Sequence, residues 1–169
     1  TALADEEKNH TAEYLFTHPV SRRHIVFEKL VRILLQIIIL NAVCILTALI
    51  VTTAIGEEFQ IKEFFLLHLA YFLLQAEIGA VCFCISAFLR RSGIGIGLGL
   101  AAILYFLNII ANITEDAEWL KYITPFGYAE AADIITDIRI DPVLAAIGCT
   151  VTLAGIAVAF FQYCRKDIY

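Results

Sequence analysis

Four long apolar stretches dominate this chain, at residues 33–55, 64–89, 94–113 and 143–164. An α-helix that rises about 1.5 Å per residue needs about 20 residues to cross a hydrocarbon core about 30 Å thick, and each stretch reaches that length. Three of them contain no charged residue, and the second contains only Glu77. The sequence therefore predicts an all-α integral membrane protein, a bundle of four transmembrane helices.

Composition favours one membrane bundle over a soluble domain. Hydrophobic residues make up 60% of the chain and its mean hydropathy is +0.80, whereas soluble domains are about 45–50% apolar. The longest polar stretches are residues 1–32 and 114–142, so no second soluble domain is expected. We expect a cytoplasmic N-terminal region over residues 1–32 and a transmembrane bundle over residues 33–169.

The charges predict the orientation of the spans. Basic clusters precede the first span, separate the second from the third and follow the fourth; they are Arg22, Arg23, Lys29 and Arg32, then Arg90 and Arg91, then Arg165 and Lys166. The acid-rich loops at residues 56–63 and 114–141 lie on the other side if every stretch crosses once. The positive-inside rule then places both termini in the cytoplasm and the acidic loops outside the cell membrane. The net charge of −5 averages over these two unlike faces, and we expect no nucleic-acid partner.

The start of the chain lacks the features of a natural N-terminus. It has no initiator Met, and its first residues lack the basic region, apolar stretch and cleavage site of a signal peptide. We expect the sequence to be a fragment whose missing N-terminal part could hold further spans.

The polar segment before the first span carries its own structure. Tyr14, Leu15 and Phe16 follow an acidic turn, and Pro19 interrupts any helix that reaches it. The pattern predicts two short helices bent at residues 17–19, the second amphipathic and lying at the cytoplasmic interface before the chain turns into the bilayer. A plain lipid-anchoring helix is the alternative, but it does not require the acidic turn or the sharp break.

The external loop is predicted to hold a short amphipathic helix over residues 124–138. Thr124 suits the N-cap and Pro125 the first helical position. The apolar residues at helical spacing are Tyr128, Ala131, Ala132, Ile135 and Ile138, and Glu130, Asp133 and Asp137 fall on the opposite side. Trp119 and Tyr122 are expected as interface aromatics. The helix either caps the bundle or rims an exit path, and capping is the favoured interpretation.

Glycines and cysteines in the spans indicate packing. Gly93 with Gly97 and Gly95 with Gly99 form two small-xxx-small pairs, which favour close approach of a neighbouring helix over a gating hinge; Gly148 and Gly155 are expected to act in the same way. Residues 93–99 lack the Gly-Lys-Ser/Thr ending of a phosphate-binding loop. All five cysteines lie in spans without metal-ligand spacing, so we interpret them as packing residues and expect no metal site.

Glu77 is the polar residue that most needs a partner, because a carboxylate at the bilayer centre costs about 2.5–3.5 kcal/mol even on the lenient insertion scale. Asn41 lies at the same depth and is the partner we expect, with Gln36 and Gln75 as further candidates. Structural and substrate-path roles for Glu77 remain equally open.

His68 lies at the same depth as Thr52 and Thr53, and as Asn108 or Asn112. A lone histidine at such a position is more often a satisfied hydrogen-bond donor between helices than a ligand. No motif of an intramembrane protease or transferase is present.

Three motifs in order resemble those of type-2 ATP-binding-cassette (ABC) permeases. The cytoplasmic motif comprises Glu6 or Glu7, Thr11, Glu13, Leu15, Phe16, Pro19, Ser21 and Arg22, followed by Lys29. The external motif covers residues 121–129 with Ala132, Asp133 and Ile134, and the final motif is Tyr163, Lys166, Asp167 and Ile168. The resemblance extends over essentially the whole chain, with a compatible order of spans. Glu77 departs from it, since that span is more usually uncharged in the family.

The resemblance implies the membrane subunit of an ATP-driven exporter. Residues 6–22 would act as a coupling helix on a separate cytoplasmic ABC ATPase, which would bind ATP and Mg, while this non-catalytic chain would hold no cofactor. A second permease copy, identical or homologous, would complete the transporter in the lipid bilayer. Such permeases typically have six spans, so this chain looks like the last four.

Two other functions remain open from the residues alone. A secondary transporter or channel fragment would use Glu77 as its ion site. Whatever the transport mechanism, Glu77, Asn41 and His68 are the candidate residues of a translocation path. A non-transporting scaffold would anchor a cytoplasmic partner through residues 6–22. The spans contain no Pro, and therefore none of the broken helices that a secondary transporter would favour.

Overall fold

The computed structural model describes residues 22–56, 60–89 and 94–165. These residues form five α-helices and two 3-10 helices and contain no strand; in chain order the elements are α3 (Arg22–Ile55), α4 (Ile61–Phe88), α5 (Ile94–Ile113), η1 (Glu115–Tyr122), η2 (Gly127–Ala129), α6 (Ala131–Asp137) and α7 (Pro142–Arg165). The predicted all-helical class is confirmed for this part of the chain.

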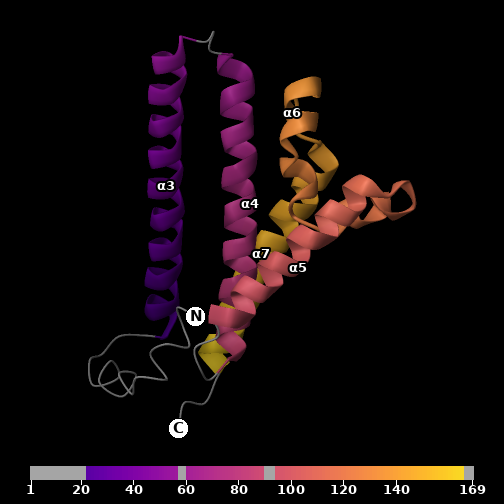
Figure 1. Cartoon of the computed structure of the whole chain (residues 1–169). Helices are drawn as coiled ribbons and strands as arrows, with labels where there is room; N and C mark the ends of the chain where they lie inside the picture. The colour runs from indigo at the N-terminus through magenta and orange to yellow at the C-terminus, as the bar shows by residue number, and fades with distance from the viewer. Residues whose placement is uncertain (1–21, 57–59, 90–93, 166–169) are drawn as a thin grey trace.

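The four long helices coincide with the four predicted spans. α3, α4, α5 and α7 contain 34, 28, 20 and 24 residues, and each is long and apolar enough to cross a membrane. Successive spans run in opposite directions, so that the start of α3, the start of α5 and the end of α7 lie at one end of the bundle (Figure 1). Arg23 and Arg165 lie at that end, while α6 lies toward the other.

The helix that holds the first span starts earlier than expected. We expected an interfacial helix to turn into the bilayer before residue 33, but α3 continues without a break from Arg22 to Ile55. Ile25 and Val26, near its start, are buried against α4 and α7 rather than against a membrane surface. This amphipathic segment is therefore the first part of the long helix. Residues 1–21, which include the predicted bend, lie outside the described residues.

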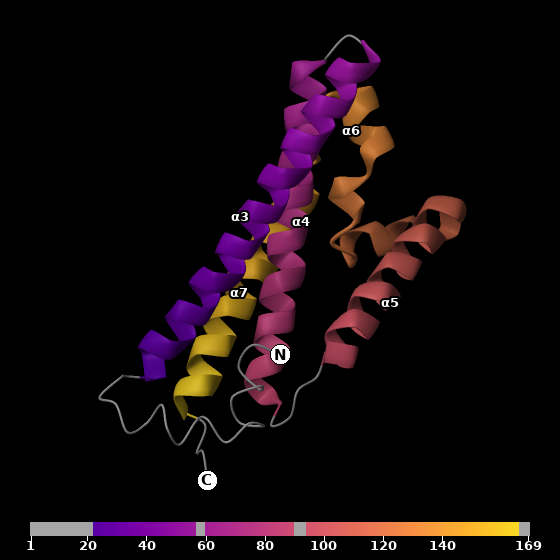
Figure 2. The same ribbon diagram turned by 60° about the vertical axis from the view of Figure 1, so that its left-hand side comes forward.

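α4 and α7 form the main contact of the bundle, and α3 packs against both (Figure 2). At the basic end, Phe83 and Ala87 of α4 share a buried cluster with Ala159 and Tyr163 of α7. Toward the other end, α4 packs on η2 and α6. α5 tilts away from the other three spans and contacts mainly η1 (Figures 1 and 2).

The glycines predicted to pack closely divide into two groups. A Cβ on Gly155 of α7 would lie 3.3 Å from the carbonyl oxygen of Ala80, and one on Gly97 of α5 would lie 3.3 Å from the Cys82 sulfur. Gly95 and Gly99 have no neighbouring atom within 4 Å of such a Cβ among the described residues, so for these two close packing stays a prediction. Gly93 lies outside the described residues.

The segment between α5 and α7, residues 114–141, is called the external segment here after its expected side. In place of the one helix predicted over residues 124–138 it holds two short ones, η2 and α6, with η1 before them. Thr124 does not cap a helix, because the next helix begins only at Gly127. Its hydroxyl donates instead to the side-chain oxygen of Asn108 at 3.4 Å. At Gly127 the chain passes so close to the Lys121 carbonyl that a Cβ would lie 2.5 Å from its oxygen. The buried face is also different: Ile134 is buried, whereas Ile135 and Ile138 are exposed.

Candidate functional site

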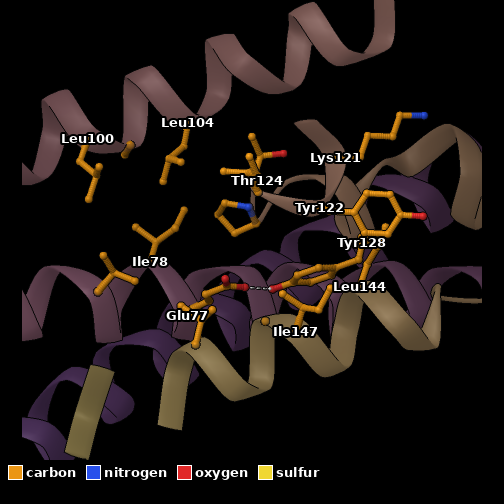
Figure 3. A pocket seen from close by; sticks show the side chains of 16 residues that line it. Glu77, Ile78, Leu100, Leu104, Lys121, Tyr122, Thr124, Tyr128, Leu144 and Ile147 are labelled. Carbon is orange, nitrogen blue, oxygen red and sulfur yellow. Dashed lines mark hydrogen bonds between the residues drawn. The ribbon is translucent and has the colours of Figure 1, made fainter. Parts of the chain in front are cut away.

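The described residues place Glu77 at the centre of a buried polar contact. Glu77 lies near the middle of α4, and only 6% of its surface is exposed. The hydroxyl of Tyr128, from η2, donates a hydrogen bond to its Oε2 at 2.9 Å (Figure 3). A residue of the external segment thus reaches an intramembrane carboxylate 51 positions earlier in the chain.

Gly148 of α7 makes room for this contact. A Cβ at that position would lie 2.5 Å from Oε2 of Glu77 and 2.9 Å from the ring of Tyr128. Any larger residue would therefore displace the carboxylate or the ring. Three elements, α4, η2 and α7, meet at this point, and each supplies one residue.

Tyr128 is the donor of the hydrogen bond to Glu77. Burial raises the pKa of the Tyr128 phenol, and the charge and hydrogen bond of Glu77 raise that pKa further. The phenol therefore keeps its proton throughout the physiological pH range. A buried carboxylate needs such a donor, because an unpaired one would be strongly destabilising.

The expected partner of Glu77 was wrong. The Asn41 amide donates to Oε1 of Gln75 at 2.7 Å and to the carbonyl oxygen of Ile37 at 2.9 Å, so it links α3 to α4 away from Glu77. Equal depth in the bilayer does not place two side chains on facing sides of their helices. Gln75 had been a candidate partner for Glu77, and it is the partner of Asn41 instead.

His68 is satisfied within its own helix. Its Nδ1 lies 2.9 Å from the Phe64 carbonyl oxygen, and its ring lies 4.2 Å from the Phe64 ring, between centroids. The two asparagines that we placed level with it have another partner: the amides of Asn108 and Asn112 donate to Oε2 of Glu130 at 3.4 and 3.0 Å. The structure therefore does not bring His68 together with either Glu77 or Asn41 in one polar cluster.

The cluster around Glu130 was missed by the sequence analysis. Asn108 joins it to Thr124, so that the end of α5 is tied to the external segment by side chains from both. Asn108 and Asn112 are four residues apart and so share one face of α5, which was the available signal. We had assigned Glu130 to the solvent side of a continuous helix, and therefore did not consider it as a partner of Asn108 and Asn112.

A cavity of about 220 Å³ opens beside Glu77 (Figure 3). Its walls come from α4, α5, α7 and the external segment. They include Ile78, Val81, Leu100, Leu104, Thr124, Tyr128, Leu144 and Ile147. Apolar side chains dominate this wall, and Glu77 is its one acidic group. α5 tilts away from α4 along the cavity, and a close approach of the two helices lies at Gly97 and Cys82.

A second space, a groove of about 680 Å³, is lined by residues of η1, η2, α6 and the start of α7. It shares Lys121, Tyr122, Tyr128 and Leu144 with the cavity. Its acidic residues are Asp133, Asp137 and Asp141, against Lys121 and Arg139. Because Tyr128 lines both spaces, a movement of its ring would change the wall between them.

No group of three potential metal ligands occurs among residues 22–56, 60–89 and 94–165. The five cysteines are free; Cys82, Cys84 and Cys164 are partly buried, but Cys44 and Cys149 are exposed on their helices. For these last two the packing role stays a prediction. Of the other predicted site residues, Glu6, Glu7, Thr11, Glu13, Leu15, Phe16, Pro19 and Ser21 lie outside the described residues, as does the side chain of Arg22.

Comparison with known proteins identifies one related family. The sequence model of the family described as ABC-2 family transporter protein matches residues 1–168. Comparisons with curated proteins and with solved structures gave no match. The family match covers both the external segment that reaches Glu77 and the polar residues before α3.

Proposed function

We propose that this chain, which belongs to the ABC-2 family of transporter proteins, is the membrane-spanning subunit of an ATP-driven exporter. The chain is the membrane component of an ABC-2 family transporter, and its described residues hold four candidate transmembrane helices. Export as the direction, coupling through the N-terminal segment and the substrate path are the parts we propose. The observation that supports this location of the substrate path is the cavity beside Glu77, which shares part of its wall with the groove.

ATP hydrolysis takes place on a separate ABC ATPase that binds ATP and Mg. Residues 6–22 bind this partner at the cytoplasmic face, with Glu6, Glu7 and Glu13 as the acidic contacts. Supporting this assignment, α3 starts at Arg22, directly after the segment, and continues into the first span. A displacement of the segment would thus act on the bundle without an intervening loop.

Both termini lie in the cytoplasm of this multi-pass cell-membrane protein, and the external segment faces outward. Support comes from the basic residues at one end of the bundle and the acidic groove toward the other. A second permease copy, in a homodimer or heterodimer, completes the transporter. In this arrangement the cavity beside Glu77 belongs to the translocation path.

Charge reversal at Glu6, Glu7 and Glu13 tests the coupling assignment. The triple variant should insert in the membrane but fail to co-purify with the ATPase. The matched control reverses three exposed acids of the external segment, Asp116, Asp133 and Asp137, and should keep the ATPase. Co-purification of the first variant at the level of the control would contradict the assignment.

Cysteine labelling tests the orientation. In a background without the native cysteines, single cysteines in place of Glu58 or Glu118 should react with a membrane-impermeant thiol reagent on intact cells. A cysteine in place of Arg91 should react only after the cells are opened. The reverse pattern would place the basic ends outside and remove the basis for ATPase coupling.

A further inference from the structure

We infer that the cavity beside Glu77 binds the head group of an amphipathic amine, with the Glu77 carboxylate as the acceptor for its ammonium. This inference names the substrate class of the path proposed above, and its role in transport rests on that proposal. Binding itself depends only on the cavity, so it can be tested separately.

The Glu77 carboxylate is incompletely satisfied by the protein. A carboxylate has about four acceptor positions on its two oxygens. Among residues 22–56, 60–89 and 94–165, the donor that reaches it is the Tyr128 hydroxyl, on Oε2. Glu77 also lines the cavity, and it is 94% buried, since 6% of its surface is exposed. A ligand N–H group in the cavity would supply the missing donor, and charge-assisted hydrogen bonds of this kind are the stronger ones.

The remainder of the wall selects an apolar body. Ile78, Leu100, Leu104 and Ile147 project toward the cavity from α4, α5 and α7 (Figure 3). Its volume of about 220 Å³ is below the range of about 300–1,000 Å³ for sites that enclose drug-sized ligands. The cavity therefore suits one end of a ligand, the amine and the first part of its chain.

The charges around the cavity favour a cation over an anion. Lys121, the basic residue of the wall, lies at the outer rim and extends away from Glu77 (Figure 3). Beyond Tyr128, the groove holds three aspartates against two basic residues. An ammonium ion would thus meet a carboxylate inside and an acidic surface outside, whereas a carboxylate ligand would be repelled by both.

Three ligands of equal chain length test the inference: hexylamine, hexanol and hexanoate at neutral pH. Their binding to the whole chain in phosphatidylcholine nanodiscs is measured by isothermal titration calorimetry, with empty nanodiscs as the background. We expect saturable binding of hexylamine, weaker binding of hexanol and none of hexanoate. Hexanoate or hexanol binding as tightly as hexylamine, or no saturable binding of hexylamine, would overturn the inference.

Variants identify the site. Glu77→Gln keeps an acceptor for Tyr128 but removes the charge, and it should weaken hexylamine binding at least about tenfold, to the level of hexanol. Glu63→Gln, a matched change on the same helix outside the cavity, should leave binding unchanged. Leu104→Trp should fill the cavity and block both ligands without touching the hydrogen bond between Glu77 and Tyr128. Equal hexylamine binding by wild type and Glu77→Gln would show that the site lies elsewhere.

The outcome separates this inference from the proposed function. A chain that co-purifies with its ATPase but shows no amine preference remains a transporter subunit, and only the substrate class fails. A chain that binds hexylamine through Glu77 but never recruits an ATPase keeps the binding site and loses the proposed coupling.

Discussion

The two sides of α4 show how differently apolar helices can meet. On the α7 side, Gly155 lets the backbones approach until a Cβ would lie 3.3 Å from the Ala80 carbonyl oxygen. On the α5 side, close approach occurs at Gly97 and Cys82, and a cavity opens beyond it, while Gly95 and Gly99 have no neighbour within 4 Å. Apolar length therefore places a helix in the membrane, but small residues in register with a partner decide whether two helices close against each other.

The largest effect should follow from closing the space at Gly148. Gly148→Ala introduces a Cβ 2.5 Å from the Glu77 carboxylate and 2.9 Å from the Tyr128 ring, and such overpacking costs about 3 kcal/mol in unfolding free energy. The control is Gly99→Ala on α5, where the space is open and the better helix propensity of Ala should stabilise by about 0.5–1 kcal/mol. Unfolding titrations in mixed SDS micelles measure both. If the two substitutions change stability equally, the contrast between the two sides of α4 is wrong.

A smaller loss is expected when the donor to Glu77 is removed. Tyr128→Phe leaves the buried carboxylate without its donor among the described residues, and such a group costs about 1–3 kcal/mol. Glu77→Gln should stay near wild type, because its amide can still accept from Tyr128. The same titrations give both values. Wild-type stability of Tyr128→Phe would show that the contact between η2 and α4 contributes little.

The smallest effect compares two glycines whose neighbours are equally near. A Cβ at Gly155 or at Gly97 would lie 3.3 Å from its closest atom, but that atom is backbone in the first case and the Cys82 sulfur in the second. A side chain can rotate away, whereas a helix backbone cannot move alone. We expect Gly155→Ala to be about 1 kcal/mol less stable than Gly97→Ala, within the usual range for single substitutions. Equal melting midpoints in detergent would mean that the seam between α4 and α7 adjusts as easily as the α5 contact.

The sequence predicted the spans because length and hydropathy leave few alternatives in a bilayer. Each predicted span agrees with α3, α4, α5 or α7 to within a few residues, apart from the early start of α3. The alternation of the helices followed from their number and from the positions of the basic residues. Length, hydropathy and charge are properties of each segment alone, and the bilayer acts on every segment in the same way.

The contacts between segments could not be predicted in the same way. Depth in the bilayer suggested Asn41 for Glu77, but the partner is Tyr128, from a segment assigned to the outer surface. The external helix was predicted from a periodicity that included Ile135 and Ile138, and both are exposed. In this segment tertiary contacts override the local pattern: Thr124 turns toward Asn108, and Gly127 packs on the Lys121 carbonyl.

α3 is longer than a bilayer is thick. Its 34 residues extend about 51 Å, against a hydrocarbon core of about 30 Å. With Arg23, Lys29 and Arg32 near its start, the excess length belongs to that end. A rod of about 51 Å that tilts by about 10° about its far end moves its start by about 9 Å, and α4 and α7, which pack on Ile25 and Val26, would have to move with it. α3 thus has the dimensions of a lever, so a displacement of several ångströms at the membrane surface becomes a slight change of slope at Asn41, where α3 is bonded to α4.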